Sequence, residues 1–191
     1  MKNNNPLNRL ERKLRIISGR WRGRKIPFEI ENGLRPTKEI VRETLFNWLD
    51  SYLPGSRCLD LFCGTGSLGL EALSRGAEHV TFIDSSNESL NLCRKNCQEL
   101  KIIQNVKIVK LDIVKDKFPK FIDKFDLFFC DPPYQKYSLE LIIEKINFLM
   151  KKNSFGVLEF GEKITDLNFD SFKIMKTKKI SKSKFLFVKK I

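Results

Sequence analysis

The sequence predicts an α/β protein built on a doubly wound, mostly parallel sheet. From residue 57 onward, short apolar segments typical of buried strands alternate with longer segments whose apolar residues recur at helical spacing. A glycine-rich segment at 64–69 joins the first of these strands to its helix. Near the C-terminus two strand-like segments follow each other without a helix between them, so one strand is expected to run antiparallel.

The repeating units supply most of the expected strands and helices. Strands are expected at 57–62, 79–84, 106–111, 125–130 and 155–160, and helices at 67–75, 86–100 and 138–150. Ser85 and Glu88 have the spacing of a capping box and are expected to begin the second of these helices. Residues 171–191 alternate Phe, Ile and Lys, which predicts two more strands joined by a polar turn near 181–183. The sheet should therefore contain seven strands.

The segment before residue 57 predicts a basic extension followed by one more helix. Residues 1–13 form a polar arm in this interpretation, and residues 14–30 form a short hairpin with glycines near its turn. Thr37 can cap the next helix, and Glu39 in its first turn complements the helix dipole. We therefore expect a basic arm and hairpin at 1–36 and an α/β domain at 37–191, which is long enough to bury a core.

The positive charge is gathered at the two ends of the chain. The net charge is +13, residues 1–25 carry nine Lys or Arg against one Glu, and residues 171–191 carry eight Lys and no acid. Such clustering indicates a polyanionic partner. The signal is stronger for arginine, because eight of the 11 Arg lie between Arg9 and Arg42. The C-terminal lysines are also compatible with a lysine-rich composition that has no partner behind it.

Several classes of protein are disfavoured by composition. The N-terminus has no apolar signal segment, and no stretch approaches the ~18 apolar residues of a membrane span. Five cysteines, an odd number, favour a reducing cytosol. Cys93 and Cys97 are spaced to share a helix face, but zinc would need two more ligands and the chain has one histidine, His79. We expect a cytoplasmic monomer with no membrane partner and no metal.

A nucleotide-like cofactor is predicted at the first strand–helix junction. Gly64, Gly66 and Gly69 fit the pattern G-x-G-x-x-G, in which glycine permits a tight turn and close approach of a ligand to the backbone. Asp84 ends the next strand, where an acid can bind both hydroxyls of a ribose. These features suit a nicotinamide dinucleotide and S-adenosylmethionine equally.

Two further carboxylates favour S-adenosylmethionine. Asp60 precedes the glycines, where it can offset the cationic amino-acid end of S-adenosylmethionine and would repel a pyrophosphate. Asp112 follows the third strand, where it can reach an adenine amine. Taken singly, Asp112 is equally compatible with a capping or loop carboxylate, and Asp60 and Asp84 are less compatible with one. Three acids at three consecutive strand ends suit a cationic nucleoside.

The tetrapeptide Asp131-Pro132-Pro133-Tyr134 is the most informative motif of the chain. It follows an apolar run and should lie at the carboxyl end of a buried strand, where open α/β sheets bind ligands. Asp131 offers a carboxylate, Pro132 offers a carbonyl without a competing N–H, and Tyr134 offers an aromatic face. Together these groups suit a flat ring that carries an exocyclic amine. A plain strand-ending turn is the alternative.

With these motifs the chain resembles the bacterial 16S ribosomal RNA guanine-N2 methyltransferases (RsmD-like), which modify the exocyclic amine of one guanine. Besides the cofactor loop and the tetrapeptide, the resemblance rests on the segments 15–25, 33–37 and 41–49, and it covers about residues 14–190. It implies a Rossmann-like class I fold with S-adenosylmethionine as cofactor, to which Arg35 and Thr37 would contribute. The chain departs from the family pattern at Asp84, where glutamate is common, and at Tyr134, where phenylalanine also occurs.

The resemblance also implies roles for the tetrapeptide and the hairpin. Asp131 and Pro132 would accept hydrogen bonds from the guanine amine, Asp131 would accept the released proton, and Pro133 and Tyr134 would complete the catalytic turn. The hairpin would bind 16S ribosomal RNA, free or in a small-subunit assembly particle, through Arg15, Arg20, Trp21, Arg22 and Arg24. Since these residues precede the Asp60–Asp84 region, we expect their replacement to leave cofactor binding unchanged.

Three rival functions remain open at this point. A DNA or RNA adenine-amine methyltransferase would use the same tetrapeptide, but the N-terminal segments and the lack of a separate DNA-recognition domain argue against DNA. A nicotinamide-dependent dehydrogenase would not need the tetrapeptide. A non-catalytic RNA-binding protein would not need the cofactor loop.

Overall fold

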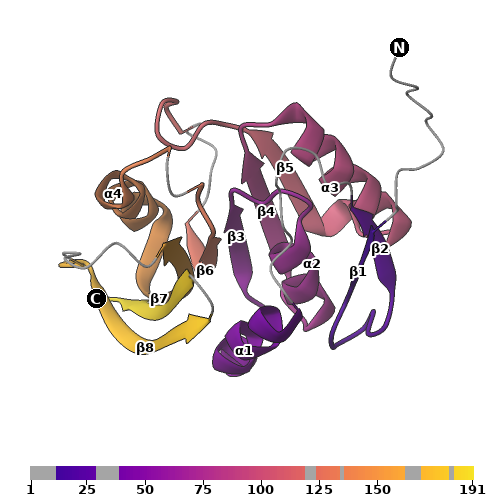
Figure 1. Cartoon of the computed structure of the whole chain (residues 1–191), viewed down its shortest axis with the longest axis horizontal. Helices are drawn as coiled ribbons and strands as arrows, with labels where there is room; N and C mark the ends of the chain where they lie inside the picture. The colour runs from indigo at the N-terminus through magenta and orange to yellow at the C-terminus, as the bar shows by residue number, and fades with distance from the viewer. Residues whose placement is uncertain (1–11, 29–38, 119–123, 134–135, 162–168, 181–182) are drawn as a thin grey trace, which may run out of the picture.

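A seven-stranded sheet lies at the centre of the computed structural model (Figure 1), which describes residues 12–28, 39–118, 124–133, 136–161, 169–180 and 183–191. In sheet order the strands are β5 (Val106–Lys110), β4 (His79–Asp84), β3 (Arg57–Leu61), β6 (Phe125–Cys130), β7 (Met150–Gly161), β9 (Ser183–Lys190) and β8 (Phe172–Ile180). The first five run parallel to one another. The chain order reverses between β3 and β6, and this reversal is where such sheets bind ligands.

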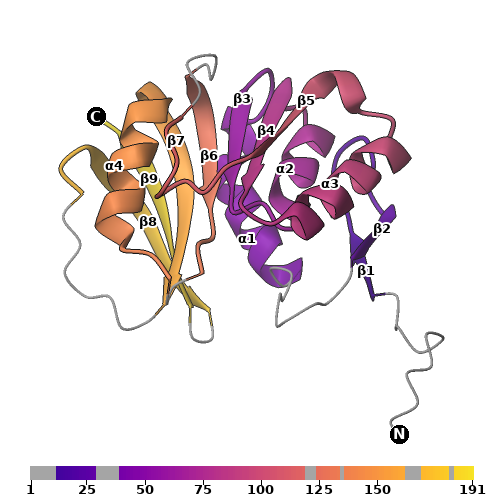
Figure 2. The same cartoon turned by 90° about the horizontal axis from the view of Figure 1, so that it is seen from above.

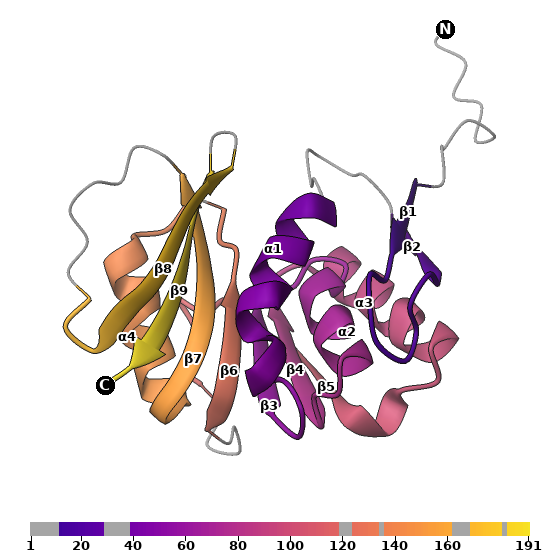
Figure 3. The same cartoon turned by 90° about the horizontal axis from the view of Figure 1, so that it is seen from below.

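Helices cover both faces of the sheet, which explains why its central strands are apolar along most of their length. The helices α1 (Glu39–Leu49), α2 (Ser67–Ser74) and α3 (Asn87–Glu99) pack on one face, and α4 (Leu139–Leu149) packs on the other. Figure 3 shows α1 in front of the sheet, whereas Figure 2 shows α4 in front of β7 and β9. A hydrophobic core lies on each face of the sheet. Consecutive residues of β6 point to opposite faces, so Phe129 packs into the core on the α1 side and Phe128 into the core on the α4 side.

The C-terminal strands confirm the predicted single antiparallel strand. β9 pairs antiparallel with β7 on one side and with β8 on the other, so β8 again runs in the direction of β7. β7 is longer than the predicted 155–160 because it begins at Met150, directly after α4. The register of β8 shifts between Ile174 and Lys176.

The predicted capping box at the start of α3 is wrong by one residue. Ser86 caps the helix: its backbone is extended, and its hydroxyl accepts the N–H of Ser89 at 3.3 Å. Asp84 explains the shift, because its carboxylate accepts the N–H of Ser86 at 2.8 Å and holds that residue outside the helix. The predicted cap of α1, Thr37, and the proposed domain boundary after residue 36 lie outside the described residues.

The predicted hairpin consists of β1 (Arg12–Arg15) and β2 (Lys25–Phe28), which pair antiparallel. Its apolar side chains Leu14, Ile16 and Ile26 join the buried cluster that α1, α2 and α3 share. The turn of the hairpin is fixed to the last turn of α2. Gly19 has φ +80°, and a Cβ there would meet the carbonyl oxygen of Ser74 at 1.8 Å.

A buried carboxylate on α2 holds this hairpin in place. Glu71, fully buried, accepts the backbone N–H groups of Ile17 at 2.8 Å and Ser18 at 3.0 Å. Its carboxylate also pairs with Arg75 at 2.8 Å and lies 3.7 Å from the buried guanidinium of Arg42. The hairpin precedes the 60–84 region in the chain, and Glu71 brings the two parts into contact in space.

Arg42 completes this buried charged group. One of its terminal nitrogens donates to the carbonyl of Arg15 at 2.7 Å, which ties α1 to β1. Burial lowers the pKa of Arg42, although the nearby Glu71 raises it in part. Sequence reasoning assigned no role to Arg42 or Glu71. The available signal was a single acid in the otherwise uncharged helix Ser67–Ser74.

Within the described ranges, every helix is too short or too polar to cross a lipid bilayer. The same ranges contain no group of three or more His, Cys, Asp or Glu side chains placed to hold a metal ion.

Candidate active site

The candidate site lies at the carboxyl ends of β3, β4, β5 and β6. Leu61 pairs with Ile83 on one side and with Cys130 on the other. The next residue of each strand therefore reaches the same edge, which brings Asp84 and Asp131 to the two sides of Phe62. The sequence predicted this meeting of carboxylates from motif order alone, and the register of the sheet provides it.

Asp84 organises the glycine-rich loop. One oxygen of its carboxylate accepts the N–H of Gly64 at 2.9 Å, and the other accepts the N–H of Ser86. Gly64 has φ +51°, and a Cβ placed there would have no described atom within 4 Å. A ligand can therefore approach the backbone at this glycine.

The other two glycines of the motif are required by packing inside the protein. Gly66 caps α2 with φ +81°, and a Cβ there would lie 2.8 Å from the sulfur of Cys93. A Cβ at Gly69 would come within 2.3 Å of the ring of Phe82. These glycines bring α2 close to β4 and α3, and so place the N-terminus of α2 beneath the site.

Asp60 is the buried member of the carboxylate group. It is 2% exposed, and its carboxylate accepts the N–H of Gly69 at 2.8 Å. Burial raises the pKa of Asp60 well above its ordinary value, the Gly69 hydrogen bond opposes that rise, and the charges of Asp131 and Asp84 add to it. A cation bound at this edge would stabilise the ionised form.

A small hollow opens beside Asp84, at the ends of β4 and β5. Four apolar side chains and two carboxylates contribute to its lining, which consists of Phe62, Ile83, Asp84, Ser85, Leu111, Asp112, Ile113 and Tyr137. The rings of Phe62 and Tyr137 lie 5.7 Å apart. Apolar walls with carboxylates at the rim suit a purine ring joined to a ribose.

Tyr137 is a site residue that sequence reasoning missed. Its hydroxyl donates to the carboxylate of Asp112 at 2.8 Å. Burial raises the pKa of Asp112, but hydrogen bonds from Tyr137 and from the N–H groups of Val114 and Lys115 outweigh burial, so the net pKa is lowered. Asp112 is therefore an ionised acceptor. The signal in the sequence was an aromatic residue three positions after Tyr134.

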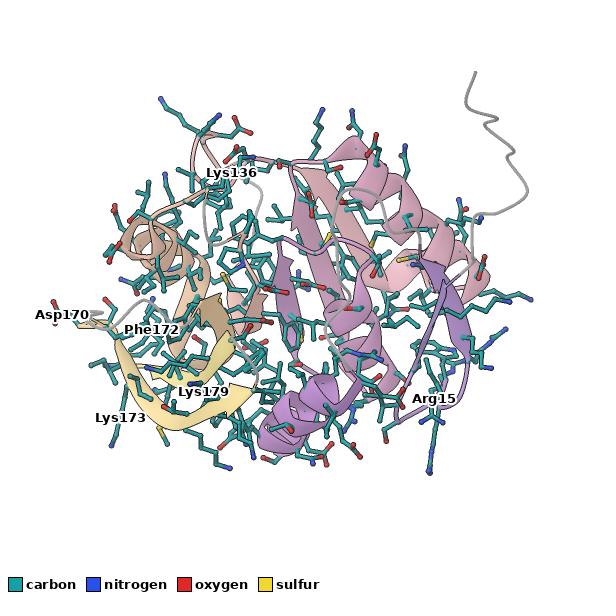
Figure 4. The ribbon with its side chains drawn as sticks, in the orientation of Figure 1. Arg15, Lys136, Asp170, Phe172, Lys173 and Lys179 are labelled. Carbon is teal, nitrogen blue, oxygen red and sulfur yellow. The ribbon has the colours of Figure 1, made fainter. Side chains whose placement is uncertain are left out.

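The candidate catalytic turn, Asp131-Pro132-Pro133, follows β6 directly. Asp131 is half-buried, Pro132 is buried and Pro133 is exposed. The carbonyl of Pro133 accepts the N–H of Lys136 at 2.9 Å, so the chain turns immediately after the motif. Lys136, labelled in Figure 4, places its ammonium 4.9 Å from the ring of Tyr137. Tyr134 lies outside the described residues, as do Arg35 and Thr37.

The predicted RNA-binding residues of the hairpin lie apart from this edge. Arg15 pairs with Glu39 at the start of α1, and Trp21 is partly buried against the core, with the guanidinium of Arg20 5.5 Å from its ring. Arg22 and Arg24 are exposed. The hairpin turn sits at the end of α2, whereas the glycine loop sits at its start, and eight helical residues span about 12 Å.

The two cysteines beside the site are buried. Burial raises the pKa of Cys63 and raises that of Cys130 well above its ordinary value, which keeps both thiols protonated. They pack as small apolar residues and supply no nucleophile.

Comparison with known proteins identifies the family. The family model described as "Conserved hypothetical protein 95" matches residues 14–189. A Haemophilus influenzae protein named ribosomal RNA small subunit methyltransferase D is 44% identical over 144 residues, which are 73% of this chain and 72% of the relative. The chain belongs to this methyltransferase family. A Buchnera aphidicola protein of the same name is 40% identical over 165 residues, 84% of each chain.

Solved structures agree with this family assignment. The structure of yhhF from Escherichia coli has a TM-score of 0.79 and 32% identity, over 93% of this chain and 98% of that one. The magnesium protoporphyrin IX methyltransferase of Synechocystis, solved with bound SAM, shares the fold with a TM-score of 0.63 and 20% identity, over 83% of this chain and 87% of that one. The predicted family and class I methyltransferase fold are confirmed. A dehydrogenase and a non-catalytic RNA-binding protein are excluded.

Proposed function

We propose that this chain transfers a methyl group to the exocyclic N2 amine of one guanine in 16S ribosomal RNA. The methyl donor is S-adenosylmethionine. The observation that carries the proposal is the position of Asp131-Pro132-Pro133 at the end of β6, beside the carboxylates and the hollow at the ends of β3, β4 and β5. The names of the relatives, which are ribosomal RNA methyltransferases, support the substrate class.

The carboxylates at this edge support S-adenosylmethionine as the cofactor. Asp84 lines the hollow and would accept the ribose hydroxyls, while Asp112, held ionised by Tyr137, would accept the adenine amine. Asp60 and the backbone at Gly64 would face the cationic amino-acid end. Arg35 and Thr37 would contribute from the segment before α1. When bound, the cofactor supplies an electrophilic methyl group on a sulfonium.

Asp131 and Pro132 would hold the target amine. The lone pair of a guanine amine is delocalised into the ring, so the amine is a weak nucleophile. Hydrogen bonds from its two N–H groups to the carboxylate of Asp131 and the carbonyl of Pro132 favour a pyramidal nitrogen that points toward the methyl group. Positioning of this kind is the main source of acceleration here. Asp131 then accepts the proton that the nitrogen loses.

The substrate base must leave its stack to reach this turn, or already lie in a single-stranded loop. Tyr134 would stack on one face of the extruded guanine, an interaction worth about 1–3 kcal/mol. Pro133 would shape the turn that presents the carbonyl of Pro132 to the base. The exposed arginines of the hairpin, with Arg15, Arg20 and Trp21, would contact the RNA beyond the site.

Mapping methyl groups on 16S ribosomal RNA tests the proposal. Mass spectrometry would compare RNA from a strain that lacks this protein, the same strain with the protein restored, and a strain with Asp131→Asn. We expect one N2-methylguanine to disappear on deletion and to return only with the wild-type chain. A missing methyl group on adenine would support the adenine alternative instead, and an unchanged methylation map would overturn both.

A further inference from the structure

We propose that the lysine edge, defined as Lys176, Lys178, Lys179 and Lys184 at the end of β8 and the start of β9, binds backbone phosphates of the RNA strand that enters the catalytic turn. This inference rests on the proposed RNA substrate. It assigns the RNA contact nearest the site to the C-terminal strands, on the opposite side of the sheet centre from the hairpin.

The register of the sheet places three of the four lysines of the lysine edge level with the catalytic turn, and Lys176 lies just before them. One row of paired residues crosses four strands: Cys130 on β6, Leu158 on β7, Leu186 on β9 and Thr177 on β8. The chain passes beyond this row at Asp131 on β6, and at Lys178 and Lys179 on β8. Lys184 of β9 lies beyond it as well, paired with Lys179. These lysines and Asp131 therefore share one edge of the sheet.

The lateral distance is short on the scale of an RNA strand. β6 and β8 are separated by three strand spacings of about 4.8 Å, which is roughly 14 Å. Figures 2 and 3 both show the end of β8 and the beginning of β9 at the edge where α1 and α4 begin. In Figure 4, Lys179 lies at that end of β8 and Lys173 lies at its other end.

The side chains on these strand ends are exposed and mostly of one sign. Residues 173–179 of β8 are all exposed, and Lys184 is half-buried. The described ends of β7, β8 and β9 beyond Val157, Met175 and Phe187 carry four lysines against one acid, Glu159. Lysine ammonium groups at such a surface attract phosphates and release counterions when they bind them.

The lysines of the edge leave the sheet on both of its faces. Lys179 and Lys184 are directly opposite each other in the β8–β9 ladder, so their side chains lie on the same face. Lys176 and Lys178 pair with Phe187 and Phe185, so they emerge on the face of the sheet that carries α1. The end of β8 and the start of β9 thus present ammonium groups on both faces of the sheet. An RNA backbone that passes around this edge can contact them from either side.

A purely structural role for the same lysines makes a different prediction. β8 is an edge strand, and lysine on an edge strand discourages pairing with other chains. Edge protection depends on lysines anywhere along β8, including Lys173 at its beginning. Phosphate binding beside the catalytic turn depends on the lysine edge alone.

Two matched triple variants separate these roles. The test variant is Lys176→Gln, Lys178→Gln and Lys184→Gln. The control variant, Lys124→Gln, Lys152→Gln and Lys173→Gln, removes the same charge from exposed lysines at the opposite end of β6, β7 and β8. Binding of a transcript of 16S ribosomal RNA would be measured over a series of salt concentrations, together with single-turnover methylation and S-adenosylmethionine affinity.

We expect the test variant to bind RNA more weakly, with a log–log salt slope reduced by about 0.7–0.9 for each phosphate that is no longer bound. Its KM for RNA should rise while cofactor affinity stays at the wild-type value, and the control variant should match the wild type. Equal salt slopes in both variants and the wild type would overturn the inference, as would self-association of the test variant with an unchanged slope. If the wild type itself binds no RNA, the proposed function fails instead.

Discussion

Asp60 and Asp131 lie near each other at the same edge of the sheet, but their surroundings give them different chemistry. Asp60 is enclosed between β4 and β6, and the N–H of Gly69 donates a hydrogen bond to its carboxylate. Asp131 is half-buried at the first position after β6. The buried carboxyl is suited to respond to a bound charge, and the half-buried one is suited to contact a substrate.

Replacement of Asp131 by Asn should slow methyl transfer without weakening cofactor binding. Asn keeps the size of the side chain but removes the charge that accepts the amine proton, so we expect a loss of about 100-fold or more in single-turnover rate. Rapid-quench methylation would measure the rate, and calorimetry with S-adenosylmethionine serves as the control. A near wild-type rate would remove Asp131 from the mechanism.

The raised pKa of Asp60 predicts that cofactor affinity increases with pH. Because the folded protein holds this proton more tightly than the unfolded chain, the ligand-free protein loses stability as pH rises from the ordinary carboxyl range through the raised pKa. A cationic ligand favours the ionised form, so binding in that pH range should release up to about one proton.

Calorimetry in two buffers of different ionisation enthalpy would measure this proton release. Asp60→Asn retains an oxygen that can accept the Gly69 hydrogen bond, so it is the matched control and should abolish the Asp60 contribution. Identical proton release in wild type and variant would show that Asp60 does not titrate on binding.

At the scale of elements, α2 connects the cofactor loop to the hairpin. Its first residues carry the glycine loop, and its last turn carries Glu71 and Ser74, which bind the backbone of the hairpin. Because the bonds on the hairpin are mostly made by backbone N–H groups, the hairpin is held in position whatever side chains it presents.

Replacement of Glu71 by Ala should destabilise the protein and loosen the hairpin. The replacement leaves the guanidinium of Arg42 buried without the Glu71 carboxylate. We expect the free energy of unfolding to fall by about 3–5 kcal/mol. Urea unfolding would measure the free energy, and tryptic cleavage after Arg22 or Arg24 would report on the hairpin. Glu71→Gln keeps an oxygen that can accept a hydrogen bond, so its free energy of unfolding should fall by less than that of Glu71→Ala. Unchanged stability and unchanged cleavage of the Ala variant would contradict this role.

At the scale of the whole molecule, the basic hairpin and the lysine-rich strand β8 lie on opposite sides of the sheet centre (Figure 3). The hairpin lies beyond α2 and α3, and β8 forms the far edge of the sheet. An RNA substrate that reaches the catalytic turn can contact basic side chains on both sides.

The triple replacement Arg20→Gln, Arg22→Gln and Arg24→Gln tests the hairpin side. RNA affinity should fall, and the log–log salt slope should decrease by about 0.7–0.9 for every phosphate that these arginines bind in the wild type. Cofactor affinity should not change, because the backbone N–H groups of Ile17 and Trp21, which bind Glu71 and Ser74, are unaffected by the replacements. A wild-type salt slope would show that the hairpin does not bind RNA phosphates.

The sequence alone determined the fold class and the methyltransferase chemistry, through the strand–helix alternation, the glycine loop and the tetrapeptide. Periodicity and motif order are local properties of the chain, so they can be recognised before the fold is known. The meeting of Asp60, Asp84 and Asp131 at one end of the sheet was predictable for the same reason. Only the tertiary structure placed Tyr137 on Asp112, Glu71 under the hairpin and the lysine edge beside the catalytic turn. Those relations depend on strand register and helix packing, which join residues that are far apart in the chain.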